Sequence, residues 1–279
     1  MKELAMTDQG DPLARIADAL ERLAPPAAPT DWTAFPAYVW DRHGGRGIDR
    51  LDAPPLPLLR GIDRQKELVT GNITRLACGY AAHDMLLWGA RGMGKSALIR
   101  GAVLAAQAAR PGSIALVQAD TEALAALSAL FADLARQERS FLVFIDDLGF
   151  EEQDTLSPRH LRSWLQGGVE ARPANIRLAV TSNRRAIVAR DASEQNDPLN
   201  PRDVVDDRLA LADRFGLSIG FHNCDQPAYL AIIAGYAEEF GLEWEEAEAL
   251  EWARRRGARS GRTAWQYITE LAGRAGKAL

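Results

Sequence analysis

From about residue 60, short runs of consecutive apolar residues alternate with longer stretches whose apolar positions recur every three or four residues. Short apolar runs between turn residues are typical of buried strands, and the longer period is typical of amphipathic helices. These patterns predict strands over 84–89, 113–119, 141–147, 175–183 and 216–221, and helices over 96–110, 121–137 and 157–167. Strands that alternate with helices predict an α/β fold around a parallel sheet.

The two ends of the chain have different patterns. Near the N-terminus, apolar residues at helical spacing follow a possible cap at Asp11 and predict a helix through Leu13, Ile16, Leu20 and Leu23. This helix either packs onto the main body or binds a partner. The stretches PPAAPTD and DAPPLPLL are proline-rich connectors.

From Gln226 onward the pattern is helical throughout, with divisions near FGLEW and RGARSGR. We therefore expect three parts. They are an N-terminal helical and proline-rich extension over 1–55, an α/β domain over 56–222, and a small helical domain over 223–279.

Composition narrows the classes of function. The apolar fraction of 47% and the charged fraction of 25% are ordinary for a globular protein. A net charge of −5 argues against binding of polyanions by the whole surface. Local basic pairs, Arg159 with Arg162 and Arg184 with Arg185, leave contact with nucleic-acid phosphates open. No apolar run approaches ~18 residues and no signal peptide is evident, so we expect a cytoplasmic protein without membrane insertion.

Metal-binding clusters of cysteine and histidine are not evident in the sequence. Cys78 and Cys224 are far apart, and we expect both to be reduced thiols in the core. The histidines are scattered, so no zinc site is predicted.

The stretch from Gly89 to Ser96 has the pattern G-x-x-x-x-G-K-[ST] and lies between a predicted strand and a predicted helix. Glycines allow a tight turn that approaches a phosphate closely, and backbone N–H groups at a helix start face the anion. Lysine supplies a compact charge for the β and γ phosphates, and the Ser96 hydroxyl is a ligand for Mg²⁺. The expected nucleotide-binding residues are Gly89, Ala90, Arg91, Gly92, Met93, Gly94, Lys95 and Ser96.

A second acidic element completes the expected metal site. In FLVFIDD, a buried strand delivers Asp146 and Asp147 to its carboxyl end, where open α/β sheets bind ligands. We expect Asp146 to hold Mg²⁺ through water and Asp147 to orient the attacking water. Aspartate is one methylene shorter than the glutamate common at the second position. Glu151 and Glu152 are nearby alternatives as base, although solvated loop charges are the plainer interpretation.

Further polar residues follow the later strands. Asn183, at the tip of RLAVTSN, is expected to touch the γ-phosphate or the lytic water, although it could simply form a turn. Arg208 and Arg214 precede the fifth strand. We expect Arg214 to enter the nucleotide site of a neighbouring subunit, against the alternative that it pairs with a nearby aspartate. Arg262 is expected to reach the γ-phosphate from the helical domain, with Arg259 as second choice.

With these features in this order along the chain, the sequence resembles the AAA+ ATPases. More narrowly, the sequence is similar to the domain of unknown function 815 family of bacterial AAA+ proteins over about residues 35 to 275. The stretches that carry this resemblance are GIDRQKE, LLWGARGMGKSALI, FIDDLGFE, TSNRRAIV, LADRFGLSIGF and RGARSGRTA.

The resemblance implies ATP binding and hydrolysis on a five-stranded parallel sheet, in an αβα sandwich with a helical lid. It also implies that Gly61 and Ile62 contact the adenine base. Two departures from the family pattern are Met93, where threonine is common, and LADRFG, which replaces a serine-containing version. Met93 contributes its backbone, so its identity should matter little.

Three functions are compatible with these residues. The favoured one is a Mg²⁺- and ATP-dependent homo-oligomer, with the ATP site at a subunit interface, that switches or remodels a protein or nucleic-acid client. A small-molecule kinase is the second, because phosphate loops also serve kinases. A loader ATPase associated with nucleic acid is the third. The sequence does not identify the client.

Overall fold

The computed structural model describes residues 13, 15–16, 30–41, 44–148, 173–183 and 214–279. The chain divides into two compact units, residues 1–30 and 31–279. In the first, Leu13, Arg15 and Ile16 are helical and exposed, and the rest of the N-terminal helix expected there lies outside the described residues. All that follows concerns the second unit.

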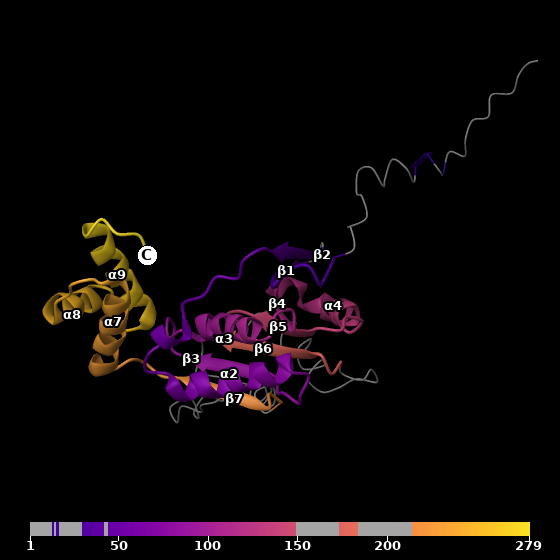
Figure 1. The fold of residues 1–279 in the computed structure, drawn as a ribbon, viewed down its shortest axis with the longest axis horizontal. Helices are drawn as coiled ribbons and strands as arrows, with labels where there is room; N and C mark the ends of the chain where they lie inside the picture. The colour runs from indigo at the N-terminus through magenta and orange to yellow at the C-terminus, as the bar shows by residue number, and fades with distance from the viewer. Residues whose placement is uncertain (1–12, 14, 17–29, 42–43, 149–172, 184–213) are drawn as a thin grey trace, which may run out of the picture. The chain divides into compact units, whose positions relative to one another are not determined.

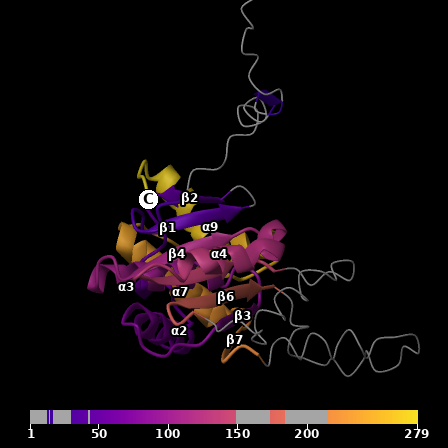
Figure 2. The same cartoon turned by 90° about the vertical axis from the view of Figure 1, so that its right-hand side faces the viewer.

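The second unit is built on a seven-stranded sheet in the order β2-β1-β4-β5-β6-β3-β7 (Figure 1). All neighbouring strands are parallel except β1 and β2. Figure 2 shows the strands from β2 and β1 at one edge to β7 at the other. Their bounds are β1 Ala37–Asp41, β2 Gly44–Ile48, β3 Met85–Gly89, β4 Ile114–Ala119, β5 Ser140–Ile145, β6 Ile176–Ser182 and β7 Leu217–Phe221.

Five of these strands, β3 to β7, are those that the apolar runs predict, and they form a continuous parallel sheet. The expected count of five strands was wrong, because β1 and β2 extend the sheet beyond β4. β1 pairs with β4 through Ala37 opposite Leu116, a contact distant in sequence. The β2 sequence GGRGI lacks the β-branched and aromatic residues that signal a strand. Residues 37–48 are thus part of the sheet.

Helices cover both faces of the sheet, whose central strands are apolar on both sides. Along β5, Leu142 and Phe144 pack into one core cluster, whereas Phe141 and Val143 pack into the other. The helices α2 (Asp63–Ala77) and α3 (Lys95–Ala109) belong to the first cluster. The second cluster contains the short 3₁₀ segment η2 (Thr121–Ala126) and α4 (Leu127–Leu134). These layers agree with the αβα sandwich (Figure 1).

The structure refines one helix prediction and leaves another untested. The stretch predicted as one helix over 121–137 begins as the 3₁₀ segment η2 and becomes α-helical only in α4. The helix predicted over 157–167 lies outside the described residues. A further 3₁₀ turn, η1 (Leu56–Leu58), precedes α2.

The C-terminal region is helical, as predicted, and is called the lid below. It consists of α7 (Gln226–Phe240), α8 (Glu246–Arg255) and α9 (Gly261–Arg274). Side chains cap two of these helices: Asp225 accepts from the Ala228 backbone N–H, and Ser260 accepts from that of Thr263. Tyr229 and Tyr267 lie fully inside the core.

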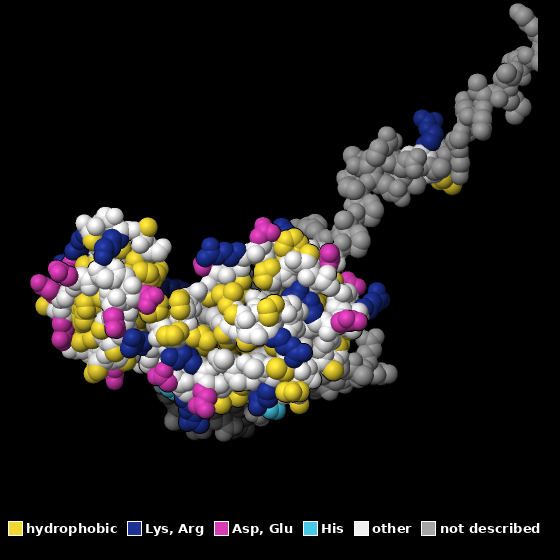
Figure 3. Space-filling model, viewed as in Figure 1, with side chains coloured by type: hydrophobic (Ala, Val, Ile, Leu, Met, Phe, Trp, Pro, Cys, Tyr) yellow, Lys and Arg dark blue, Asp and Glu magenta, His cyan; other side chains and the backbone are white. Residues whose placement is uncertain are grey.

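Two expectations from the sequence concern the charge of the surface and the insertion of helices into a membrane. On the face that Figure 3 shows, acidic and basic side chains are interspersed over lid and sheet domain, in keeping with the small net charge of −5. Within the described part of the chain, none of the helices combines the length and apolar character needed to span a membrane.

Candidate functional site

The turn between β3 and α3 has the backbone shape that its glycines allow. β3 ends at Gly89 and α3 begins at Lys95. Gly89, Gly92 and Gly94 have φ angles of 118°, 77° and 86°, where other residues are strained. A Cβ atom on Gly89 would also lie 2.1 Å from the Phe221 carbonyl oxygen. The loop can therefore hold this shape only with glycine at this position.

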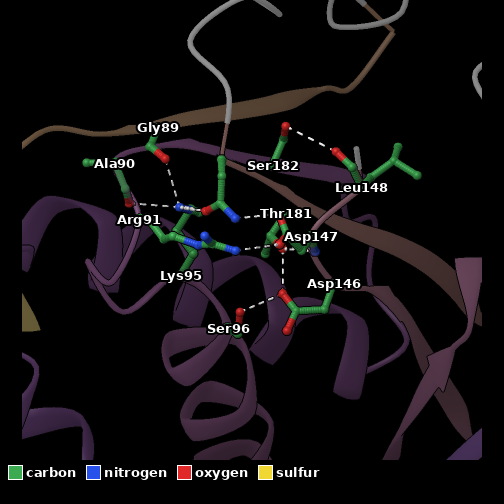
Figure 4. Close-up of polar contacts among 11 residues, drawn as sticks. Gly89, Ala90, Arg91, Lys95, Ser96, Asp146, Asp147, Leu148, Thr181 and Ser182 are labelled. Carbon is green, nitrogen blue, oxygen red and sulfur yellow. Dashed lines mark hydrogen bonds and ion pairs between the residues drawn. The ribbon is translucent and has the colours of Figure 1, made fainter. Parts of the chain in front are cut away.

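Lys95 is buried beneath this loop, with 6% of its surface exposed. Its Nζ donates to the carbonyl oxygens of Gly89 and Ala90, each at 2.9 Å, and to Asn183 Oδ1 at 3.0 Å (Figure 4). Burial lowers the pKa of Lys95, whereas the nearby carboxylates of Asp147 and Asp146 raise it. The side chain is thus a desolvated cation held by groups that an anion could replace.

Ser96 and Asp146 meet at the start of α3. The Ser96 hydroxyl donates to Asp146 Oδ1 at 2.6 Å, and the Thr181 hydroxyl donates to the same oxygen at 2.6 Å. Hydroxyl and carboxylate oxygens are hard ligands of the kind that Mg²⁺ prefers. The donor set therefore fits a magnesium site of the expected composition.

Asp147 follows β5 in a left-handed backbone conformation, with φ of 52°. Its backbone N–H donates to Thr181 Oγ1 at 2.8 Å, which fixes this turn. The amide of Asn183 donates to Asp147 Oδ1, and Arg91 Nη2 lies 3.6 Å from Asp147 Oδ2. Both carboxylate oxygens of Asp147 thus have partners (Figure 4).

These groups line a cavity of about 660 Å³ between the sheet domain and the lid. Its polar part and its apolar part come from different elements. The polar part contains Arg91, Lys95, Ser96, Asp146, Asp147, Thr181, Asn183 and Arg262. The apolar part contains Leu58, Leu59, Ile62, Ile232, Tyr236 and Trp265.

The apolar part comes from η1, the start of α2, and two lid helices. Ile62 and Tyr236 are buried, at 5% and 6% exposure. The rings of Tyr236 and Trp265 pack against each other with centroids 5.1 Å apart. A Cβ on Gly94 would lie within 4 Å of Leu59 and Ile62, so the apolar part adjoins the glycine loop.

The lid contacts the glycine loop directly. The backbone N–H of Arg262 donates to the Gly92 carbonyl oxygen at 3.0 Å. A Cβ on Gly92 would lie 2.9 Å from Ser260 Oγ, so glycine is needed for this close approach. The start of α9 is thereby held against the loop.

Most residues expected at the site line the cavity together. These are Arg91 to Ser96, Asp146, Asp147, Asn183, Arg262 and Ile62. Gly89 and Ala90 take part through their carbonyl oxygens. Gly61 is exposed beside Ile62, with φ of 77°, and does not line the cavity.

The remaining candidates lie elsewhere. Arg214 does not line the cavity. Its Nη1 is buried and has no hydrogen-bond partner among the described residues. Arg259 lies by a second hollow, beside Cys224. Seven further candidates lie outside the described residues: Glu151, Glu152, Arg159, Arg162, Arg184, Arg185 and Arg208.

Sequence reasoning missed several lining residues. Thr181, which orders both aspartates, lies near the end of β6, two positions before Asn183 in the sequence, so the period of two could have revealed it. Tyr236 and Trp265 have the helical spacing of ordinary core residues. Arg60 also lines the cavity, and Gly235 makes room for it, since a Cβ there would lie 2.3 Å from Arg60 Nε.

The described residues contain no group of three or more histidine, cysteine or acidic side chains arranged to hold a metal. Cys78 is half-buried and Cys224 is buried, both as free thiols. Burial raises the pKa of Cys224 to about 11, so this thiol stays protonated at neutral pH.

Known proteins resemble the chain in sequence and in structure. The profile of the family described as "Protein of unknown function (DUF815)" matches residues 33–275. None of the curated proteins matches the sequence.

Among solved structures, the Holliday junction branch migration motor RuvB of Thermotoga maritima is similar, with a TM-score of 0.51 and 18% identity over 81% of this chain and 68% of that one. The Aeropyrum pernix Orc1 protein, solved in complex with DNA, has a TM-score of 0.55 and 15% identity over 77% of this chain and 61% of that one. Together with the sheet order, these neighbours show the P-loop AAA+ fold.

Proposed function

The chain belongs to the DUF815 family of AAA+ proteins, and we propose that it binds ATP together with Mg²⁺ and hydrolyses it. The observation that carries this proposal is the position of Lys95. A buried cation lies beneath a loop of glycines with positive φ angles, at the first residue of a helix. Burying a charge is unfavourable unless an opposite charge compensates it. A polyphosphate supplies that charge.

Binding of the phosphates would use main-chain N–H groups of the loop and of the start of α3. In the present structure Lys95 Nζ is bound by two loop carbonyl oxygens and by Asn183. Phosphate oxygens would replace some of these partners with stronger, charged acceptors.

The metal would be held by Ser96 and Asp146, whose oxygens already lie 2.6 Å apart. Bound Mg²⁺ would neutralise charge on the β and γ phosphates. Thr181, through its bond to Asp146, keeps that carboxylate in position.

Hydrolysis requires a water molecule to be oriented and its proton to be accepted. We assign these tasks to Asp147 and Asn183, which are hydrogen-bonded to each other. The water oxygen attacks the γ-phosphorus, the bond from that phosphorus to the β–γ bridging oxygen breaks, and ADP and inorganic phosphate leave. Asp147 accepts the proton of the attacking water. Arg262 would contact the γ-phosphate from the lid.

The adenine base would lie in the apolar part of the cavity. Ile62, Tyr236 and Trp265 offer apolar and aromatic surface to a purine ring. Gly61 is assigned a supporting role, because its positive φ sets the turn that presents Ile62.

We further propose that the active form is a homo-oligomer in which Arg214 acts on the neighbouring subunit's ATP. Two observations support this assignment: its Nη1 is buried without a hydrogen-bond partner among the described residues, and Arg214 does not line the cavity of its own chain. Arg214→Ala should retain ATP binding and lose most hydrolysis, by about 1,000-fold. Mixing it with Lys95→Ala subunits should restore some activity, because each variant lacks what the other supplies. Absence of complementation would contradict this.

The client we propose is a macromolecule, and nucleic acid is the first class to test. Both neighbours named above are connected with DNA by name, RuvB as a branch migration motor and Orc1 as a DNA complex. Binding through phosphates would weaken steeply as salt rises. Titration of duplex DNA at two salt concentrations, with and without ATP, tests this class. Phosphate transfer to a metabolite would instead favour a kinase.

Titration calorimetry with ATP, with and without Mg²⁺, and measurement of phosphate release test the central proposal. We expect saturable binding that Mg²⁺ strengthens and a slow or client-dependent release of phosphate. Lys95→Ala should abolish both signals. Arg110→Ala, which removes an exposed charge at the far end of α3, is the matched control and should change neither. No heat beyond dilution in the unaltered protein would refute the proposal.

A further inference from the structure

The side chain of Arg91 reaches into the site, although the loop between β3 and α3 does not require a particular side chain at this position. It projects into the cavity with 71% of its surface exposed. Its guanidinium lies 3.6 Å from Asp147 Oδ2, and the Asp147 side chain is 51% exposed (Figure 4). A loop that used only its backbone would tolerate almost any side chain here.

The ion pair blocks the carboxylate to which hydrolysis is assigned. Asn183 occupies Asp147 Oδ1 and Arg91 occupies Oδ2. A water molecule that hands its proton to Oδ2 needs the place beside that oxygen that the guanidinium occupies. Arg91 and the attacking water would therefore compete for the same oxygen of Asp147.

The pair is also easily exchanged. Both partners are at least half exposed, and such ion pairs contribute only about 0 to 1 kcal/mol. Arginine binds phosphate oxygens through two parallel hydrogen bonds, which are charge-assisted and stronger. The terminal phosphate held by Lys95 would be a better partner for Arg91 than Asp147 is.

We propose that, when ATP binds, the Arg91 guanidinium breaks its ion pair with Asp147 and binds the terminal phosphate instead. This proposal rests on the proposed function. The exchange does two things at once. It frees Asp147 Oδ2 to accept a proton, and it adds a cation from the same subunit to the γ-phosphate. The γ-phosphate thus removes the inhibition of its own hydrolysis, and ADP does not.

Equilibrium affinities for ATP and ADP test the exchange. Arg91→Ala should weaken ATP binding about 10-fold and change ADP binding less than 2-fold, since only ATP carries the γ-phosphate. Arg91→Lys keeps the charge without the planar fork and should fall between. A loop-shaping role would instead weaken both nucleotides equally, and that result would overturn the proposal.

A double-variant cycle tests the competition between the two partners. Asp147→Asn should tighten ATP binding about 3-fold, because Arg91 is released from its pair. In Arg91→Ala protein, the same change should have a clearly smaller effect. An equal gain in both backgrounds would reflect only the removal of a negative charge near the phosphates and would overturn the exchange. No gain in either background would overturn it as well.

The controls separate this proposal from the proposed function. Lys95→Ala should abolish binding of both nucleotides; if it does not, the proposed function fails, whatever Arg91 does. If Lys95→Ala behaves as expected and Arg91→Ala leaves the ratio of ATP to ADP affinity unchanged, only the exchange fails. Arg110→Ala, the same loss of charge at an exposed site, should leave that ratio unaltered.

Discussion

The polar and apolar parts of the cavity are built in opposite ways. In the polar part, side chains from the start of α3 and two strand ends satisfy one another through short hydrogen bonds, as Lys95 does with Asn183 and Ser96 does with Asp146. In the apolar part, residues from η1 and the lid meet through packing, as Tyr236 and Trp265 do. Directional contacts fix positions closely, whereas apolar surfaces tolerate small shifts. We therefore expect the polar part to govern chemistry and the apolar part to govern which base is bound.

The strongest test removes the cation of the polar part. Lys95→Ala should weaken ATP and inorganic triphosphate alike, on the order of 1,000-fold, because two or more charged hydrogen bonds are lost. Calorimetry with both ligands measures this. If inorganic triphosphate still binds normally, the phosphates do not lie at Lys95 and the division into two parts is mistaken.

The next largest effect is expected on the rate of ATP hydrolysis, from Asp147 in the polar part of the cavity. Asp147→Asn should bind ATP at least as tightly as the unaltered protein but slow phosphate release roughly 100-fold, because the amide cannot accept a proton from water. Single-turnover measurements separate the chemical step from product release. Unchanged turnover would assign the base to another residue.

The apolar part should show the opposite selectivity. Trp265→Ala should weaken ATP about 10-fold and leave inorganic triphosphate unchanged, since only ATP carries a base to stack on the indole. Trp252→Ala, which removes a lid tryptophan that does not line the cavity, is the control. Equal loss for both ligands would mean that Trp265 acts on the loop and not on the base.

The smallest effect lies in the lid away from the cavity. Glu248 accepts hydrogen bonds from Arg274 and Tyr267. These bonds lower the pKa of Glu248 below its usual value, and the bond from Arg274 has the larger effect. A carboxyl with a lowered pKa in the folded state stabilises the fold above its unfolded value of 4.5, and that contribution is lost as pH falls through the folded pKa. Glu248→Gln should cost roughly 0.5 kcal/mol at neutral pH, given the solvent exposure of the pair.

Urea unfolding at neutral pH and at acidic pH measures this difference, which should shrink in acid. Binding of ATP at neutral pH should not change. A change in ATP affinity would mean that the fold of the whole lid, and not the residues of the apolar part alone, sets base binding.

The same division explains what could be predicted from the sequence. The strands β3 to β6 are largely buried on both faces and thus form nearly continuous apolar runs, whereas the edge strand β7 is only partly buried. The glycine loop and the acids after β5 form compact local motifs. The aspartates and Asn183 come together because carboxyl ends of adjacent parallel strands share an edge.

The rest depends on contacts between distant segments. β1 becomes a strand by pairing with β4, and β2 by pairing with β1, and no local pattern in GGRGI predicts this. Trp265 lines the cavity because α9 is packed against the loop, yet its spacing is that of a core residue. The Arg91–Asp147 pair joins a loop to a strand end, and a motif that specifies only glycines, lysine and serine says nothing of it.

One bond between main-chain groups gives the lid mechanical influence over the loop. The Gly92 carbonyl accepts from the Arg262 N–H, and the planar peptide that carries this carbonyl also carries the N–H of Met93. Any rotation of α9 that keeps this bond must tilt that peptide, and its N–H turns with it. In the proposed function, a protein bound to the outside of the lid would thereby loosen or tighten the contact with phosphate without entering the cavity.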